Sequence, residues 1–184
     1  MRPSDRAVRA VIALSFCMLA VGSTPSAMRV GYRVPALSGG WISDQDFKGR
    51  VVVLDIWATW CGPCRMVIPH LVKLHADLKD KGVAVVGLNA DEPAGPETEA
   101  NIRAFVKEFG MSYPVGLMNQ EAYATIAQVM GFAPEEGMSI PTTIVIGRNG
   151  LVVKRYPGYF PGQEDEIRAI VTKILAPAEP PSKR

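Results

Sequence analysis

The run over residues 51–64 constrains the fold of this chain more than any other stretch. Its first half, residues 51–57, is almost continuously apolar and β-branched, which predicts a strand buried on both faces of a sheet. A short turn follows, and Cys61-Gly62-Pro63-Cys64 then opens a helix that we expect over residues 62–81. A Cys-x-x-Cys pair directly after a buried strand indicates a redox-active dithiol.

The remaining apolar segments predict one α/β domain. Buried strands are expected at 83–88 and 141–146, and Asn149-Gly150 predicts a hairpin turn to a returning strand. Because strands and helices alternate, we expect a central mixed β-sheet with helices on both faces. The other expected elements are a hairpin around Gly39-Gly40, an extended segment at 113–115, and helices capped by Thr98, at 122–129 and at 163–175. The apolar face of the 62–81 helix is expected at Met66, Val67, Leu71, Leu74 and Leu78.

Composition excludes several other classes of protein. A formal net charge of +2 over 184 residues gives no basic surface for nucleic acid. Three cysteines cannot form a disulfide framework for a domain of this size. Hydrophobic residues make up 48% of the chain, which suffices for a packed core. The third cysteine, Cys17, lies in an N-terminal apolar run and is not expected to take part in the chemistry.

The N-terminus predicts export. Arginines at positions 2, 6 and 9 precede an apolar run over residues 10–21, and small residues follow. A membrane span needs about 20 residues, so a cleaved signal over residues 1–27 is the first interpretation and an uncleaved membrane anchor the second. Both place the domain, residues 28–176, in the periplasm or outside the cell, with attachment to the inner membrane in the second case. Residues 177–184 predict a disordered tail.

The cysteine pair supports thiol–disulfide exchange without any other cofactor. A helix N-terminus lowers the pKa of a thiol, so Cys61 is the expected nucleophile, and Cys64 is expected to resolve the mixed disulfide. Three-residue spacing places both sulfurs on one helix face, which allows an internal Cys61–Cys64 disulfide. Gly62 lets a partner backbone approach, and Pro63 fits the first helical turn.

Asp55 is a carboxylate inside the predicted buried strand, six positions before Cys61. Burial of a charge is costly, and it raises the pKa of a carboxyl group. Such a group suits proton exchange with Cys64. The alternative is a structural carboxylate that accepts hydrogen bonds from a loop.

These residues resemble the thioredoxin superfamily, and in particular its TlpA/ResA-like branch. The resemblance rests on Trp57-Ala58-Thr59-Trp60 before Cys61-Gly62-Pro63-Cys64 and covers residues from about 34 to 175. It implies a thioredoxin-like fold, and it implies that Asp55 assists deprotonation of the resolving cysteine. It also implies that Pro141 follows a cis peptide bond and faces the cysteines, while the backbone of Ile140 pairs with the substrate.

Three further features bear on substrate binding. Trp60 is expected to form an apolar platform beside the reactive sulfur, whereas Trp57 belongs to the core. Glu92 lies in an Asn-x-x-Glu stretch similar to one that aids substrate recognition in ResA-like proteins, and the alternative is a solvated loop acid. The loop over residues 132–139 is longer than in these relatives, and we expect it beside the cysteines, where it would affect substrate choice.

The sequence therefore predicts a monomeric thiol:disulfide oxidoreductase that reduces protein disulfides outside the cytoplasm. The resemblance implies substrates among apocytochrome c thiols, as in cytochrome c biogenesis, copper-site cysteines or oxidised periplasmic proteins, and a membrane thiol as electron donor.

Two alternative functions involve the same cysteines. The same sulfurs could serve a copper-binding module or metallochaperone, which copper titration of the reduced protein would distinguish. Zinc would need more ligands, and His70 and His75 lie five positions apart on one helix, so they do not converge with the sulfurs, and no metal site is expected. A thiol peroxidase needs Pro-x-x-x-Thr-x-x-Cys, which Leu54 and Thr59-Trp60-Cys61 do not supply.

Overall fold

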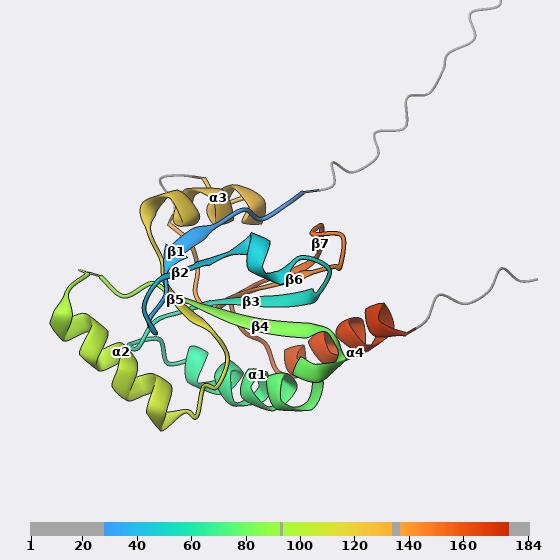
Figure 1. Ribbon diagram of the computed structural model, residues 1–184, viewed down its shortest axis with the longest axis horizontal. Coiled ribbons are helices and arrows are strands. Elements are labelled where there is room, and N and C mark those ends of the chain that lie inside the picture. The colour runs from blue at the N-terminus through green and yellow to red at the C-terminus, as the bar shows by residue number, and fades with distance from the viewer. Residues whose placement is uncertain (1–27, 93, 134–136, 177–184) are drawn as a thin grey trace, which may run out of the picture.

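A five-stranded mixed sheet forms the centre of the molecule (Figure 1). The computed structural model describes residues 28–92, 94–133 and 137–176. The predicted signal or anchor at 1–27 and the predicted tail at 177–184 lie outside these residues. The sheet has the order β5-β4-β3-β6-β7, with parallel neighbours on one side of β3 and antiparallel neighbours on the other. Its strands are β3 (Val51–Trp57), β4 (Val83–Asn89), β5 (Val115–Leu117), β6 (Thr142–Ile146) and β7 (Val152–Pro157).

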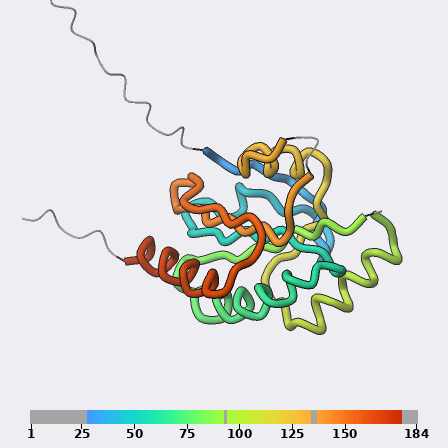
Figure 2. Tube along the Cα trace, turned by 180° about the vertical axis from the view of Figure 1, so that it is seen from behind, coloured from blue at the N-terminus to red at the C-terminus, as the bar shows by residue number. Residues whose placement is uncertain are grey.

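Helices cover both faces of the sheet, as the sequence predicts. Figure 1 shows α1 and α4 side by side under one face with α2 next to α1, and Figure 2 shows the same layer from behind. The other face is covered by α3 and by a two-stranded hairpin, in which β1 pairs with β2 around Gly39-Gly40. The elements are β1 (Arg33–Pro35), β2 (Trp41–Ser43), α1 (Cys64–Leu78), α2 (Pro96–Glu108), α3 (Gln120–Met130) and α4 (Gln163–Leu175), with short 3₁₀ turns at Asp44–Phe47 and Lys79–Lys81.

The central strand β3 separates two hydrophobic cores. All of its residues are buried, and successive side chains point to opposite faces of the sheet. Val51, Val53 and Trp57 pack with α1, α2 and α4, whereas Leu54 and Ile56 pack with α3 and the hairpin. Burial on both faces explains why this strand reads as a continuous apolar run.

The helix predicted over residues 62–81 is shorter in the structure, and one of its predicted apolar positions is not buried. α1 begins at Cys64, and a 3₁₀ turn at Lys79–Lys81 leads to Gly82, whose φ of 89° ends the helical segment. Met66 is 53% exposed, so its predicted place in the core is wrong. It lies five positions from Leu71, which is about 140° around the helix axis.

The predicted start of α2 also needs correction. Gly95 is the residue before the helix and Pro96 is its first residue, so Thr98 lies inside the first turn and does not cap it. Proline fits the first position because its φ is already helical and its missing N–H would have no helical partner. For α3, the side chain of Asn119 caps the helix by accepting from the backbone N–H of Ala122 at 2.9 Å.

Candidate active site

The two predicted redox cysteines lie together at the start of α1. Cys61 and Cys64 form a disulfide with an S–S distance of 2.00 Å. Cys61 occupies the turn before the helix, and the backbone N–H of Cys64 donates to Cys61 Sγ at 3.2 Å. The first N–H groups of a helix have no partner within it, so this donor and the helix dipole favour negative charge on the Cys61 sulfur.

Access from solvent differs between the two cysteines. Cys64 is fully buried, whereas Cys61 keeps 3% of its surface exposed. Gly62 and Pro63 are exposed, and Trp60 beside them is 70% exposed. A partner protein would therefore approach Cys61 over a surface made by Trp60, Gly62 and Pro63, the residues that the sequence singles out.

Asp91 holds the turn that precedes Cys61, a residue that the sequence reasoning missed. Both of its carboxylate oxygens lie 3.1 Å from the backbone N of Thr59, which donates to them. Asn89 donates from Nδ2 to Asp91 Oδ2 at 2.9 Å and accepts from the Asp91 N–H at 3.1 Å. The sequence pattern that could have indicated this arrangement is an Asn-x-Asp at the end of a strand. The neighbouring Glu92 is exposed, and its role in recognition stays a prediction.

Asp55 is fully buried in β3 and points to the same face as Val53 and Trp57, toward the layer that contains α1. The hydroxyl of Thr143, its antiparallel partner on β6, donates to Asp55 Oδ1 at 3.0 Å. The donor to this carboxylate therefore lies in a strand and not in a loop, and the role of Asp55 in catalysis stays a prediction. Burial raises the pKa of Asp55 from 3.8 to about 7, and the Thr143 hydrogen bond opposes this rise only in part.

Pro141 follows a cis peptide bond, as the resemblance implies. Thr142 is the register partner of Ile56, so Pro141 lies at the end of β3 from which the Cys61 turn departs. The carbonyl of Pro141 accepts from the Gly158 N–H at 2.7 Å, which joins the 158–162 loop to this end of the sheet. Ile140 is half-buried and contacts both cores.

The loop over residues 132–139 is described in part, since residues 134–136 lie outside the described structure. At its end, the Met138 N–H donates to the Tyr123 hydroxyl of α3 at 2.8 Å, and the Ser139 carbonyl accepts from Thr142 Oγ1 at 2.5 Å. These contacts join the end of the loop to α3 and β6. Its effect on substrate choice stays a prediction.

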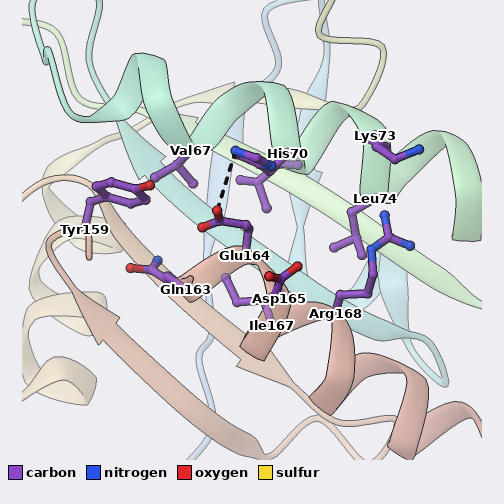
Figure 3. A pocket seen from close by; sticks show the side chains of 11 residues that line it. Val67, His70, Lys73, Leu74, Tyr159, Gln163, Glu164, Asp165, Ile167 and Arg168 are labelled. Carbon is purple, nitrogen blue, oxygen red and sulfur yellow. Dashed lines mark ion pairs between the residues drawn. The ribbon is translucent and has the colours of Figure 1, made fainter. Parts of the chain in front are cut away.

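A separate cavity of about 120 Å³ lies between α1 and α4 (Figure 3). His70 Nε2 from α1 lies 3.8 Å from Glu164 Oε1 of α4, and Val67, Tyr159 and Arg168 also line the space. Neither cysteine lines it. The cavity is therefore distinct from the exchange site, although its first residue, Val67, is one helical turn beyond Cys64.

Within residues 28–92, 94–133 and 137–176, no three histidine, cysteine, aspartate or glutamate side chains gather as a metal site. His70 pairs with Glu164, and His75 packs edge-on against Tyr113 with ring centroids 5.9 Å apart. In the same residues, no helix is both long and apolar enough to cross a bilayer.

Comparison with known proteins defines the class. The redoxin family profile matches residues 35–171. Thiol-disulfide oxidoreductase ResA of Bacillus cereus is 31% identical over 141 residues, which cover 74% of each chain. The ResA of Bacillus thuringiensis is 32% identical over 136 residues, or 71% of each chain. A structure titled as a putative thiol:disulfide interchange protein DsbE from Chlorobium tepidum superposes with a TM-score of 0.67 at 25% identity, covering 82% of this chain and 97% of the other.

A thioredoxin-like fold with a cysteine pair at the start of its first long helix defines a thiol-disulfide oxidoreductase. The chain belongs to the redoxin family and is similar to the ResA enzymes within it.

Proposed function

We propose that this enzyme works as a reductase of protein disulfides outside the cytoplasm. The observation that carries the proposal is the geometry of the pair. A backbone N–H at the start of α1 is directed at Cys61 Sγ, while Cys64 is fully buried and the carboxyl of Asp55 lies on the same face of the sheet. This arrangement supplies one stabilised thiolate and one protected thiol with a proton acceptor nearby.

The reaction has two exchange steps. The Cys61 thiolate attacks one sulfur of a substrate disulfide, an S–S bond forms between enzyme and substrate, and the other substrate cysteine leaves as a thiolate. The Cys64 thiolate then attacks Cys61 Sγ, which forms the Cys61–Cys64 disulfide and releases the second substrate cysteine. The substrate gains two electrons and the enzyme pair loses two, so no bound cofactor is needed.

Asp55 would take the proton of the Cys64 thiol before the second step. A general base works best when its pKa lies near the working pH, and burial raises the pKa of Asp55 to about 7. Trp60, Gly62, Pro63, Ile140 and Pro141 would bind the substrate chain, and Glu92 would contribute to its recognition.

The substrate class follows from the resemblance to ResA-like enzymes. We expect cysteines of apocytochromes c or of copper sites, or disulfides of other exported proteins, with a membrane thiol as donor. The basic and apolar N-terminal segment supports an exported location, with membrane attachment if the segment is retained. The combination of Asp55 with Gly62-Pro63 supports the reducing direction.

A trapping experiment tests the catalytic assignment. The Cys64→Ser variant should accumulate a mixed disulfide on Cys61 with its substrate, which non-reducing electrophoresis and mass spectrometry would identify. The Cys61→Ser variant should trap nothing and reduce no disulfides. Cys17→Ser is the matched control and should behave as the parent protein. Full reductase activity in Cys61→Ser would refute the assignment.

The redox potential tests the proposed direction. A reductase should have a standard potential well below about −200 mV, toward the value near −270 mV that is typical of thioredoxin. Equilibration of the Cys61–Cys64 pair with glutathione or dithiothreitol buffers would give this value. A potential near −120 mV, as for strong oxidants, would instead indicate disulfide formation.

A further inference from the structure

The cavity between α1 and α4 has an apolar floor and opens to solvent (Figure 3). Its floor consists of side chains that are at most 4% exposed, namely Val67, Leu71 and Leu74 of α1 and Ile167 of α4. At its mouth, the side chain of His70 is 48% exposed. Apolar cavities of about 150 Å³ in proteins can hold a benzene molecule. The volume of about 120 Å³ found here therefore suits one branched aliphatic side chain.

Two side chains that line this cavity each have a buried polar atom without a hydrogen-bond partner among the described residues. These atoms are Gln163 Nε2 and Glu164 Oε2. Gln163 is 1% exposed, and its Oε1 accepts from the Phe160 N–H at 3.4 Å. Glu164 faces His70 through Oε1, at 3.8 Å, which leaves Oε2 free. Buried polar atoms without partners cost free energy, so a ligand that satisfies both atoms would be favoured here.

The two free atoms are complementary to a polypeptide backbone. The amide nitrogen of Gln163 donates, and a carboxylate oxygen of Glu164 accepts. Every residue except proline carries one backbone N–H donor and one C=O acceptor. A peptide segment with an apolar side chain would therefore fill the floor and satisfy both atoms. A hydrocarbon would leave both atoms unpaired, and a small ion would leave the floor empty.

The cavity lies within reach of a polypeptide held at the cysteines. Tyr159 lines the cavity, and the N–H of the preceding Gly158 donates to the carbonyl of Pro141 at 2.7 Å. On α1, His70 lies six positions beyond Cys64, which is about 9 Å along the helix axis. Three residues of an extended chain span about 10 Å. A residue three or four positions from the substrate cysteine can therefore reach the cavity.

We propose that this cavity is a specificity subsite for the polypeptide substrate. It takes an apolar side chain three or four positions from the cysteine that bonds to Cys61. Gln163 Nε2 donates to a backbone carbonyl of the same segment, and Glu164 Oε2 accepts from one of its N–H groups. The inference rests on the mixed disulfide at Cys61 proposed above. The subsite selects among substrates and takes no part in breaking or forming the S–S bonds.

Competition between synthetic peptides is the first test. The Cys64→Ser protein is equilibrated through Cys61 with two cysteine peptides in a thiol-disulfide buffer, and mass spectrometry gives the ratio of the two mixed disulfides. One peptide carries leucine and the other glycine, three or four positions before or after the cysteine. Leucine should be favoured about 10-fold in at least one of these placements. Equal amounts of both mixed disulfides in all four placements would overturn the proposal.

A filled cavity is the second test, made in the same Cys64→Ser background. Leu74→Phe places a larger side chain in the floor and should reduce the leucine preference to less than about 2-fold. Leu78→Phe is the matched control, because Leu78 lies one helical turn further along α1 and does not line the cavity. It should keep the preference. Thermal unfolding checks that both variants are folded, and an undiminished preference in folded Leu74→Phe would overturn the proposal.

The polar contact is tested separately, which also decides the matter if Leu74→Phe does not fold. A peptide with an N-methylated leucine cannot donate from that backbone nitrogen. N-methylation should lower the share of the leucine peptide about 5-fold in the Cys64→Ser protein, the size expected for one hydrogen bond to a carboxylate. In a Glu164→Ala variant of that protein, N-methylation should cost less than about 2-fold. Equal losses in the two proteins would overturn the contact with Glu164.

The peptide experiment separates this inference from the function on which it rests. If the Cys64→Ser protein forms no mixed disulfide with any of the peptides, the proposed exchange at Cys61 fails. If mixed disulfides form equally well with leucine and glycine peptides, the exchange at Cys61 holds and the subsite alone fails.

Discussion

The two faces of β3 differ in chemistry although they belong to one strand. Toward α3 and the hairpin, Val52, Leu54 and Ile56 belong to a core of aliphatic side chains that also includes Tyr32. Toward α1, Val51 and Val53 share their face with Asp55 and Trp57, both of which leave a buried polar atom without a described partner.

Within this one strand, the face toward α3 contributes to stability, whereas the face toward α1 also carries a functional side chain. Burial of aliphatic side chains on the α3 face contributes free energy of folding, and no carboxyl group of β3 is buried on that face. On the α1 face, part of that gain is offset by a buried carboxyl group, which the chain retains next to its redox cysteines.

The largest effect on the free energy of unfolding is expected for Asp55→Asn. Asp55 binds its proton more tightly in the folded chain, with a pKa of about 7, than at its ordinary value of 3.8. Stability should therefore fall as the pH rises from about 4 to about 7, by roughly 4 kcal/mol from this group. Asp55→Asn removes this loss, so its advantage over the parent should grow across that range and stay constant above it. Urea unfolding of the oxidised proteins at several pH values would measure the difference. A constant difference between the two proteins would contradict a raised pKa.

Leu54→Ala tests the opposite face of the same strand. Leu54 is fully buried, and its truncation should cost about 3 kcal/mol through lost apolar contact and the cavity left behind. The loss should be the same at pH 5 and pH 8, because burial raises the pKa of Tyr32, the titratable residue of this core, above its usual value and it keeps its proton throughout that range. Urea unfolding measures the stability, and resolution of the mixed disulfide should keep its parent pH dependence in the folded variant. A shifted pH profile would show that the two faces are coupled.

An intermediate loss of stability is expected when Gly87, beside Asp55, or Gly116, on the aliphatic side, is replaced by alanine. An added Cβ at Gly87 would meet Trp57 and Tyr113, so Gly87→Ala should cost about 2 kcal/mol and also shift the Asp55 titration. At Gly116 the Cβ would lie 2.4 Å from Val34 Cγ2 and 3.1 Å from Leu88 Cδ2, on the aliphatic side. Gly116→Ala should lose similar stability in urea unfolding without moving the Asp55 midpoint in NMR titration. Equal shifts in both variants would refute a local effect of Gly87 on Asp55, its register partner.

The smallest effect is expected at the exposed ion pair beside the site. Arg65 Nη1 lies 3.3 Å from Glu108 Oε1, and both side chains are largely exposed. Glu108→Gln should change stability by less than about 0.5 kcal/mol, since water screens such pairs. Arg65→Ala should cost somewhat more, because the guanidinium also lies over the ring of Phe105 at 4.8 Å. Urea unfolding compares the two, and a loss above 2 kcal/mol for Glu108→Gln would contradict the contrast with the buried carboxyl of Asp55.

Local sequence predicted the elements around the site better than the contacts within it. Patterns among neighbouring residues predict the apolar run of β3, the helix at 163–175 and the cysteine pair. The structure confirms all three. The start of α2 was misplaced at Thr98, because a capping residue and a threonine inside the first turn give the same local signal. The cis peptide bond before Pro141 was predicted only through the family resemblance.

The partners of the functional side chains could not be predicted because they lie far away along the chain. Asp55 and its donor Thr143 are 88 positions apart, and Thr59 and Asp91 are 32 apart. Strand register across β4, β3 and β6 brings these residues to one place.

The Cys-x-x-Cys after a buried strand determined the class of chemistry by itself, because spacing and helix position fix which sulfur ionises. The sequence likewise marked Asp55 as costly to bury. Only the tertiary structure decided how that cost is met, since the pKa of a buried carboxyl depends on which donors surround it. The donor to Asp55, Thr143 on the neighbouring strand β6, is brought there by sheet register, which no local pattern encodes.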